Sequence, residues 1–407
     1  MALLRLVMEL PDLSASAVTA LTVDHGLRDN SAQEAQQVAA WCAALGVRHE
    51  TLVWNGDKPI SGIQARARDA RYRLLAEKCA ALEIASILTA HSQTDQAETV
   101  LMRLGRGAGT RGLSAMAANT QIAAGVNSPI RLLRPLLSFP RDRITATTQR
   151  FAQDFIDDPS NDDTGFERIR VRQELVKMTQ AGIVSEQSLA DTAAACARDR
   201  KICDDRVQSL FRETSGHFTA WGGVVLPVER VEALKSEFGF AEMMAALMVA
   251  VSGRPYRPRA DQAEAAILAA LRSRSATLSG ILLRVKKDTV ILMREPAGLL
   301  GRAGVPAREP IRVPPGKAIL FDRRFGIKNL LETEGFVCAA GRLNSAHFSE
   351  FCTEFDGPRE AASTVPVVLK TNDIEALKGQ TLEIDRCHSD VWSLVEDRFM
   401  KSEVLRF

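Results

Sequence analysis

Residues 84–112 read IASILTAHSQTDQAETVLMRLGRGAGTRG. An apolar β-type run at 84–90 is followed by a polar segment at 91–95, and apolar residues then recur at helical spacing as far as Leu104. This pattern predicts a strand, a polar loop and a helix in direct succession. Such a succession is the repeating unit of a parallel sheet, and ligand sites in these sheets lie at the carboxyl ends of the strands.

The same alternation of strand and helix precedes this stretch. Strands are predicted over 17–23 and 48–54, and helices over 31–45 and 62–81. We therefore expect an α/β fold in which a Rossmann-like parallel sheet is covered by helices on both faces. Polar residues also follow the first two strands, as Asp24-His25-Gly26 and Trp54-Asn55-Gly56.

The pattern changes after the turn signal at 157–161. Residues 166–251 are mainly helical in pattern, and 281–285 and 289–293 are predicted to form a hairpin. We expect three domains: a catalytic α/β domain over 1–160, a helical domain ending in the hairpin over 161–300, and a small α+β region over 301–407.

Composition limits the class of protein. The chain has 407 residues, 52 Lys and Arg against 50 Asp and Glu, and 46% apolar residues, which excludes a disordered or fibrous class. The longest uncharged apolar run, 243–251, is too short to span a membrane, and no secretory signal is visible, so we expect a cytoplasmic protein. Seven scattered cysteines without a C-x-x-C spacing argue against a disulfide framework, a zinc site and a dithiol centre.

Basic residues gather locally although the net charge is only +2. Residues 99–141 hold six arginines and no acid, and further basic stretches lie at 66–73 and 254–287. Arginine forms bidentate contacts with phosphates and stacks on bases, so these stretches favour a nucleic-acid partner over an acidic small molecule.

Asp95 and Glu98 are three residues apart at a predicted helix start, so both carboxylates project from one face. Such a pair can hold a metal ion, hold a substrate ammonium or act as a base, but acids also favour helix N-termini because of the helix dipole. His91 is expected above the same cleft, as a catalyst or as a structural histidine. The glycine-rich segment 105–112 can bring backbone N–H groups onto a phosphate.

Five segments together resemble the tRNA(Ile)-lysidine synthase family, a branch of the N-type ATP pyrophosphatases, or PP-loop proteins. They are VDHGLR at 23–28, IQARARDARY at 63–72, AHSQTDQAETVLMRLGRGAGTRGLSAM at 90–116, RPLL at 134–137 and DPSN with FERIRVR within 158–172. The segment TLSGILLRVKKDTVILMREP at 277–296 is also similar to the family's C-terminal RNA-binding portion.

This resemblance implies an ATP-dependent C–N ligase that modifies tRNA. The wobble cytidine of tRNA(Ile) with a CAU anticodon is adenylated on O2 with release of pyrophosphate, and the ε-amine of free lysine then displaces AMP to give lysidine. The expected partners are therefore tRNA(Ile), lysine and ATP, with Mg²⁺ expected alongside ATP. A homodimer is considered as well.

The resemblance also implies roles for individual residues. The expected catalytic residues are His91, Asp95 and Glu98, of which Asp95 and Glu98 bind the lysine ammonium. ATP contacts are expected at Asp24, His25, Arg106, Gly107 and Gly109. Contacts to tRNA are expected at Arg68, Arg71, Arg168, Arg170 and Arg172. No metal-ligand set is predicted.

The sequence also departs from the family pattern. Thr94 stands where the family usually has an acid, and Ile169 where it usually has Asn. The 407 residues contain no Ser-Gly-Gly-x-Asp-Ser loop, and Met1-Ala-Leu-Leu resembles the opening of the helix that follows it. We therefore expect the first strand to be missing, because translation starts upstream or because this is a shortened relative.

Two alternatives to the ligase stay open. One is a non-catalytic tRNA-binding relative, because the triphosphate loop is absent from the sequence. The other is a different PP-loop tRNA-modifying enzyme, such as a thiolase, against which the absence of a C-x-x-C pair argues.

Overall fold

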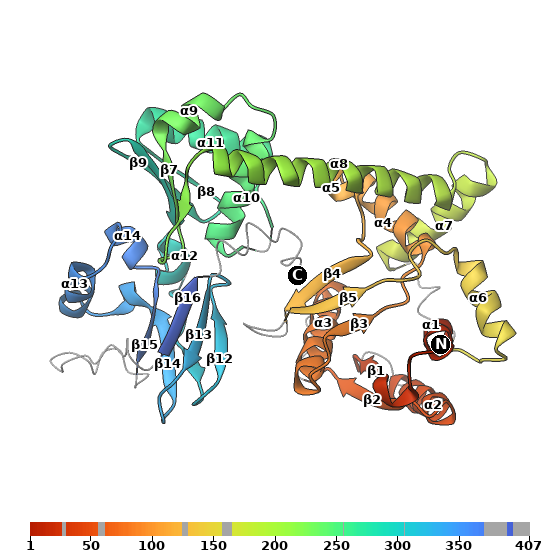
Figure 1. The fold of residues 1–407 in the computed structure, drawn as a ribbon. Coiled ribbons are helices and arrows are strands. Elements are labelled where there is room, and N and C mark those ends of the chain that lie inside the picture. The colour runs from red at the N-terminus through yellow and green to blue at the C-terminus, as the bar shows by residue number, and fades with distance from the viewer. Residues whose placement is uncertain are drawn as a thin grey trace. The chain divides into compact units, whose positions relative to one another are not determined.

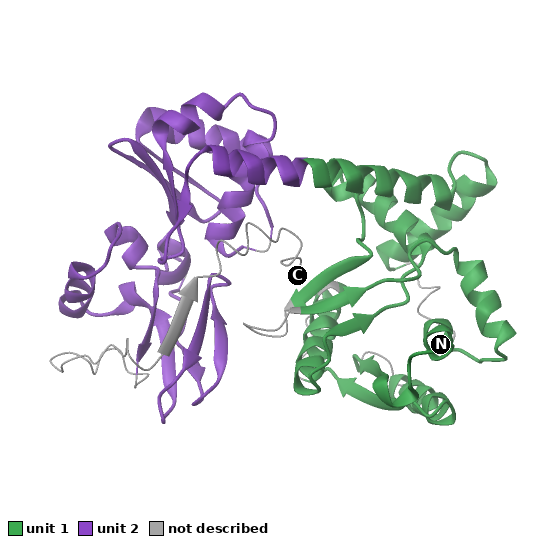
Figure 2. Cartoon of the chain, viewed as in Figure 1, with its two compact units in different colours: residues 1–124, 128–202 green, residues 125–127, 203–407 purple. Residues whose placement is uncertain are grey.

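The structure is a computed structural model that describes residues 1–26, 30–55, 62–123, 129–156, 165–254, 256–304, 306–369 and 389–393. The chain divides into two compact units (Figure 2). Unit 1 comprises residues 1–124 and 128–202, and unit 2 comprises residues 125–127 and 203–407. The predicted division into three domains stays a prediction.

Unit 1 contains most of the alternating helices and strands (Figure 1). Its helices are α1 (Ala2–Met8), η1 (Ala15–Ala17), α2 (Ser31–Ala44), α3 (Ile63–Ala81), α4 (Gln93–Gly105), α5 (Thr110–Leu113), α6 (Arg141–Arg150), α7 (Glu167–Gln180) and the first part of α8 (Glu186–Glu213). Its strands are β1 (Thr19–Asp24), β2 (Arg48–Val53), β3 (Ser86–Leu88), β4 (Asn119–Ala123) and β5 (Pro129–Leu133).

The strands of unit 1 confirm part of the predicted topology. β1 and β2 pair in parallel from Thr19 opposite Arg48 to Asp24 opposite Val53, and β3 pairs in parallel with β5. β4 and β5 were not predicted, and the expectation of a wholly parallel sheet is wrong for β4, which runs antiparallel to β5. The connection between β4 and β5 is only five residues long, and a parallel pairing needs a crossover of a dozen or more.

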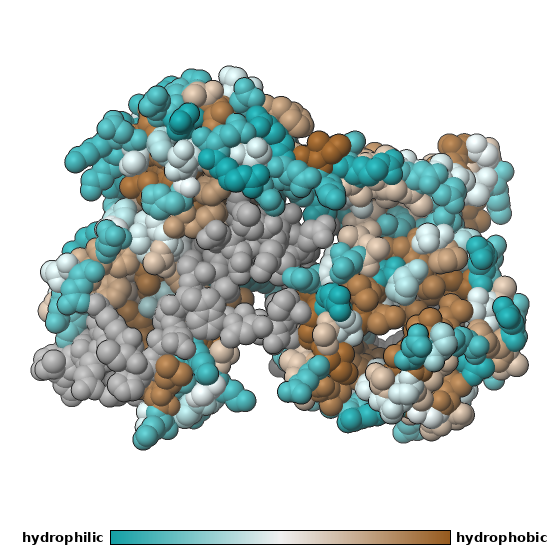
Figure 3. Space-filling view, in the orientation of Figure 1, coloured by the Kyte–Doolittle hydropathy of each residue, from teal (hydrophilic) through white to brown (hydrophobic). Residues whose placement is uncertain are grey.

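Within the described residues, the strands of unit 1 form two separate sheets, β1-β2 and β3-β5-β4. Several residues of these strands are only partly buried. All six residues of β1 are half-buried. Val53 in β2 and Leu88 in β3 are 48% and 43% exposed. Brown apolar surface is accordingly visible on unit 1 in Figure 3. Parallel strands are ordinarily buried on both faces, so these strands lack part of the usual cover.

Unit 2 follows with small sheets and short helices. Its helices after α8 are α9 (Val228–Leu234), α10 (Phe240–Ser252), α11 (Ala260–Ser273), α12 (Ala297–Leu300), η3 (Ala340–Arg342), α13 (Ser345–Thr353) and α14 (Arg359–Ala362). The first sheet contains β6 (His217–Phe218), β7 (Val224–Pro227), β8 (Ser275–Leu278), β9 (Ile281–Lys286) and β10 (Thr289–Arg294). The last strands are β11 (Ile311–Val313), β12 (Ala318–Phe321), β13 (Phe325–Asn329), β14 (Gly335–Ala339), β15 (Pro366–Leu369) and β16 (Ser389–Ser393).

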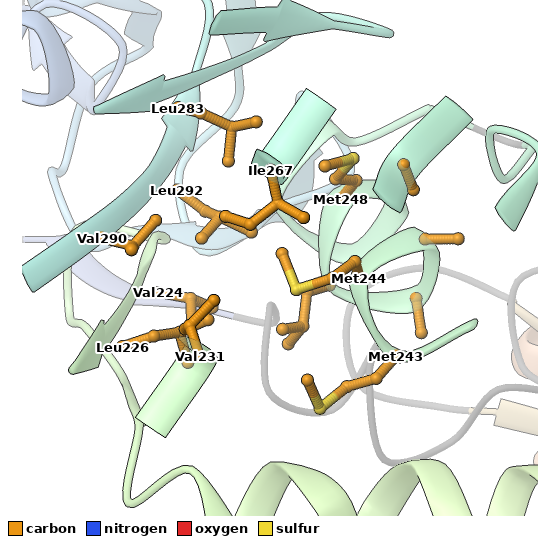
Figure 4. Packing of buried hydrophobic residues seen from close by; sticks show 14 of the residues in the cluster. Val224, Leu226, Val231, Met243, Met244, Met248, Ile267, Leu283, Val290 and Leu292 are labelled. Carbon is orange, nitrogen blue, oxygen red and sulfur yellow. The ribbon is translucent and has the colours of Figure 1, made fainter. Parts of the chain in front are cut away.

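The largest core of unit 2 lies between α10, α11 and the five-stranded sheet. Met243, Met244 and Met248 of α10 and Ile267 of α11 pack against strand residues such as Leu292 (Figure 4). The apolar run 243–251 is thus a buried core helix, and no helix among the described residues is long and apolar enough to span a membrane. The predicted hairpin is confirmed, since β9 and β10 pair antiparallel.

A buried ion-pair group joins β10 to the β12–β13 hairpin. Asp322 lies at the tip of the hairpin, and its Oδ2 accepts hydrogen bonds from Arg294 Nε (3.0 Å) and Arg324 Nε (2.9 Å). Arg324 is fully buried, which lowers its pKa to about 10, although the charge of Asp322 opposes that shift. This group ties residues on both sides of position 300 into one packed structure.

Candidate functional site

The polar loop after β3 begins α4 with a complete capping box. The backbone N–H of Ser92 donates to Asp95 Oδ2 (2.7 Å), its hydroxyl donates to the same oxygen (2.8 Å), and the Asp95 N–H donates back to Ser92 Oγ (3.3 Å). Burial alone would raise the pKa of Asp95, but the Ser92 hydrogen bonds and the charge of Arg168 hold this pKa below its ordinary value. Asp95 is therefore an anion at neutral pH.

Asp95 and Glu98 bind two arginines of α7. Arg168 donates through Nη2 to Asp95 Oδ1 (2.6 Å) and through Nε to Glu98 Oε2 (2.5 Å). Arg172 Nε donates to Glu98 Oε1 (2.6 Å). The Glu98 side chain is fully buried, whereas the side chains of Arg168 and Arg172 are 34% and 21% exposed. Both carboxylates thus lie on one face, as predicted, and that face meets guanidinium groups.

Four residues of this arrangement were predicted to contact substrates. Asp95 and Glu98 were expected to hold a lysine ammonium, and Arg168 and Arg172 were expected to contact tRNA. In the structure both Glu98 oxygens are bonded to arginine, and these four side chains form one network between α4 and α7. Arg170 is exposed and donates to the backbone carbonyl of Gly165 (3.0 Å). The substrate contacts of these residues remain predictions.

His91 lies beside this network and is neutral. Its Nδ1 is hydrogen-bonded to Thr89 Oγ1 at 2.9 Å. Burial lowers the pKa of His91 to about 4; Asp95 opposes this shift, and the charges of Arg134, Arg71 and Arg68 reinforce it. The imidazole is therefore uncharged at neutral pH, with one ring nitrogen that donates a hydrogen bond and one that accepts.

Arg68 of α3 lies near several other arginines of unit 1. Its guanidinium lies over the Tyr72 ring, 5.0 Å from the centroid. The pKa of Arg103 is lowered first by burial and then by the charges of Arg68, Arg200 and Arg106. Arg68 belongs to α3, Arg103 to α4 and Arg200 to α8, and Arg106 directly follows α4. The positive charge that acts on Arg103 makes this part of unit 1 a candidate site for an anion.

Arg134 is a second arginine held within unit 1. It is 6% exposed and donates through Nη1 to the Ala117 carbonyl (2.7 Å) and to Thr120 Oγ1 (3.1 Å). Burial lowers its pKa, the side chain of Tyr72 raises it, and the charge of Arg68 lowers it again. Sequence reasoning did not assign Arg134 and Tyr72 to the site, although both lie in the segments quoted for the family resemblance.

The glycine-rich segment after α4 is folded by arginine contacts to its own backbone. Arg103 Nη1 donates to the carbonyls of Gly112 (2.7 Å) and Ala115 (3.1 Å). Gly107 has a φ of +69°, which favours glycine, and Gly109 precedes the four-residue helix α5. Arg106 pairs with Glu167 of α7 at the surface. The predicted phosphate role of Arg106, Gly107 and Gly109 remains a prediction.

The predicted cluster after β1 meets the one after β2. The Gly26 N–H donates to Asp24 Oδ1 (2.8 Å), and the Trp54 N–H donates to the Asp24 carbonyl (2.9 Å). The His25 and Trp54 rings meet edge to face, with centroids 6.0 Å apart. Gly56 and the motif residues 27–28 and 158–161 lie outside the described residues. Among the residues that are described, no three His, Cys, Asp or Glu side chains gather as a metal site.

A PP-loop domain family model matches residues 1–179. The chain is 46% identical over 181 residues to the tRNA(Ile)-lysidine synthase of Bradyrhizobium diazoefficiens, covering 44% of this chain and 48% of that protein. It is 34% identical over 320 residues to that of Ruegeria pomeroyi (79% and 72%) and 32% identical over 286 residues to that of Methylobacterium nodulans (69% and 83%). The chain belongs to the tRNA(Ile)-lysidine synthase family.

The coverage differs between these relatives. The match spans about half of the Bradyrhizobium lysidine synthase, 48% of its length. Among solved structures, a U34-tRNA thiolase from Methanococcus maripaludis with its [4Fe-4S] cluster shows a TM-score of 0.37 and 13% identity over 44% of this chain and 61% of its own, too low to support an argument. The family model that matches residues 1–179 confirms that the chain contains an α/β PP-loop domain, and small β-sheets follow it.

Thr94 and Ile169 are the two residues that were expected to depart from the family pattern. Thr94 Oγ1 donates to Glu186 Oε2 of α8 (2.7 Å), so an acid at position 94 would face another carboxylate. Beside it, Gln93 Nε2 donates to Gln187 Oε1 (2.8 Å). Ile169 is buried, 7% exposed, where a polar Asn would need a hydrogen-bond partner. Thr94 therefore suits its contact with Glu186, and an apolar residue suits the buried position 169.

Proposed function

We propose that this chain is an ATP-dependent ligase that joins free lysine to C2 of the wobble cytidine in tRNA(Ile) with a CAU anticodon. The similarity to lysidine synthases over 72% and 83% of their lengths carries this proposal. Cytidine O2 attacks the α-phosphorus of ATP and pyrophosphate leaves; the lysine ε-amine then attacks C2, and the C2–O2 bond breaks as AMP leaves. A tRNA substrate agrees with a cytoplasmic location.

The arginines around Arg68 are the proposed phosphate site. Arg103 is partly desolvated, and the charges of Arg68, Arg200 and Arg106 act on it. A phosphate group bound among them would relieve this repulsion and, at the transition state, would have its developing charge stabilised by fixed cations. Arg71 and Arg170 are proposed as outer contacts to the tRNA backbone.

The proposed lysine site uses Asp95 together with Arg168. Their side chains are 20% and 34% exposed, and they place a negative and a positive group side by side. The α-ammonium and α-carboxylate of an amino acid are adjacent, so this pair can bind both of them, whereas the ε-ammonium would be bound by Asp95 alone. Glu98 is fully buried and acts in this proposal by positioning Arg168. His91, which is neutral, would hydrogen-bond the substrate.

The proposal extends to the triphosphate loop and the sheet. Because the 407 residues lack Ser-Gly-Gly-x-Asp-Ser and β1 is only half-buried, we propose that full activity needs a further strand and loop of that kind. Mg²⁺ would arrive with ATP, held largely by phosphates and water. Asp24, His25, Gly107 and Gly109 are proposed near the nucleotide.

The test is incorporation of labelled lysine into a tRNA(Ile) transcript, with ATP–pyrophosphate exchange measured in parallel. The 407-residue chain is compared with a longer chain that carries the upstream codons, and a transcript with a GAU anticodon is the control. Incorporation only into the CAU transcript supports the ligase. Binding of tRNA without exchange in either chain would favour the non-catalytic alternative, and a thiolated product would favour the other PP-loop chemistry.

Two further properties can be measured with the same material. Affinity for tRNA should fall steeply between about 50 and 200 mM salt, because each neutralised phosphate releases counterions. A flat response would contradict the phosphate contacts. Light scattering would test the proposed homodimer.

A further inference from the structure

Tyr72 of α3 is a buried tyrosine with a charged side chain over its ring. The residue is 4% exposed, and α3 packs against β4 and β5 (Figure 1). Arg68, about one helical turn earlier, is exposed, and its guanidinium carbon lies 5.0 Å from the centroid of the Tyr72 ring. A cation over the face of a tyrosine is attracted by the ring quadrupole. The ring therefore supports the Arg68 side chain.

Tyr72 is fixed in turn by Arg134. Burial lowers the pKa of Arg134, and a hydrogen bond with the Tyr72 side chain opposes this shift. Arg134 is 6% exposed and also donates to the Ala117 carbonyl (2.7 Å) and to Thr120 Oγ1 (3.1 Å), so its guanidinium is tied to the backbone before β4 and to β4 itself. The tyrosine ring is thus in place before any ligand binds, which limits the freedom that Arg68 loses on binding.

Arg68 has cationic neighbours and no acidic partner. Within the described part of the chain, no Asp or Glu side chain pairs with it. Burial lowers the pKa of three side chains in unit 1, and the charge of Arg68 lowers each of them further; these are His91, Arg103 and Arg134. An arginine that is held in place without a carboxylate to neutralise it is suited to a phosphate, which a guanidinium binds in a bidentate manner.

We propose that Tyr72 is a positioning residue for a phosphate subsite at Arg68: the ring holds the guanidinium in place, and the guanidinium donates to the phosphate oxygens. This inference rests on the phosphate role proposed above for Arg68. A phosphate of the tRNA backbone and a phosphate of ATP or pyrophosphate share the chemistry that this subsite recognises.

The experiment measures binding to the full 407-residue chain, with two probes. One is a tRNA(Ile) transcript with the CAU anticodon, titrated between about 50 and 200 mM salt. The other is inorganic pyrophosphate, followed by calorimetry. Tyr72→Leu removes the ring and should weaken binding about two- to fivefold, the change that corresponds to loss of an exposed cation–π contact. Tyr72→Phe keeps the ring and should weaken binding less than Tyr72→Leu does.

A double variant separates positioning from a general effect on the fold. If Tyr72 acts through Arg68, Tyr72→Leu should not weaken binding further in a chain that already carries Arg68→Gln. Arg68→Gln by itself should lower the slope of log affinity for tRNA against log salt by about 1, because one phosphate contact is lost. Arg68→Lys keeps the charge but loses the planar group, and it should also weaken binding.

Arg73→Gln is the matched control on the same helix. Arg73 is exposed, lies about 140° around α3 from Arg68 and already pairs with Glu77 (3.3 Å). Its replacement should change the affinity for either probe by less than about twofold.

Weaker binding of tRNA alone would identify the phosphate as part of the tRNA backbone, and weaker binding of pyrophosphate alone would identify the nucleotide; both results support the proposal. Three results would overturn it: binding of neither probe, unchanged binding in Arg68→Lys, or an equal effect of Tyr72→Leu with and without Arg68→Gln. Circular dichroism verifies folding, and if Tyr72→Leu is unfolded, the exposed substitution Arg68→Lys decides. A chain that binds through Arg68 but does not incorporate lysine would refute the ligase and leave this subsite standing.

Discussion

Replacement of Glu98 by Gln tests whether the network between α4 and α7 stabilises unit 1. Glu98 is fully buried and accepts hydrogen bonds from Arg168 and Arg172. Removal of one partner of a buried ion pair ordinarily costs about 3–5 kcal/mol. Gln keeps one carbonyl oxygen, Arg168 keeps its bond to Asp95, and both arginines are partly exposed. We therefore expect Glu98→Gln to lower the free energy of local opening of α4 by about 2–3 kcal/mol.

The assay is native-state hydrogen exchange, followed by mass spectrometry on peptides that cover α4. A loss of 2–3 kcal/mol corresponds to exchange about 30-fold to 150-fold faster where exchange reports local opening. This readout is preferable to a global melt, because a chain with two units need not unfold in one step.

Glu167→Gln is the matched control, since Glu167 also joins α7 to α4, through Arg106, but at the surface. The side chains of that pair are 45% and 61% exposed, so its loss should cost less than about 1 kcal/mol. Arg172→Gln should lower the free energy of local opening of α4 by less in the Glu98→Gln variant than in the native chain. If Glu98→Gln and its control change exchange equally, the buried network does not hold α4.

Three further predictions follow from the same site. In a chain that is active, Asp95→Asn should raise the KM for lysine more than the KM for ATP, and equal increases would reject its contact with lysine. The folded pKa of His91, about 4, lies below its ordinary value of 6.5, so His91 contributes stability above pH 6.5 that is lost as pH falls toward 4; a His91→Gln variant should show a shallower loss, and an NMR titration of His91 with a midpoint near 6.5 would refute the assignment. Thr94→Asp places a carboxylate against Glu186 and should make local opening of α4 easier by about 1 kcal/mol, seen as about fivefold faster hydrogen exchange. Glu186→Gln should restore the slower exchange, whereas no restoration would show that the charge of Glu186 is not the cause.

Much of the fold could be predicted from the sequence. The first two strands and the helix that follows each of them were predicted from periodicity and caps, and the structure has them within a few residues of the predicted bounds. β4 and β5 were not predicted, because an antiparallel pair depends on contacts between its strands as much as on local pattern.

The arrangement of the site could be predicted from the sequence only in part. The spacing of Asp95 and Glu98 correctly predicts a shared face, because helix geometry is local. It cannot predict that Arg168 and Arg172, about seventy residues later, come to that face, because this depends on how α7 packs against α4. Motif resemblance named all four residues but assigned them to different partners.

The ion-pair group around Asp322 decides where a shorter version of the protein can be cut. A fragment ending at residue 300, the boundary suggested by sequence pattern, would keep Arg294 without the carboxylate that neutralises it. That guanidinium is 8% exposed in the intact chain, so the fragment would have to hydrate it by opening the end of β10. Residues 203–300 should therefore not fold autonomously, and expression trials should keep Asp322 with them.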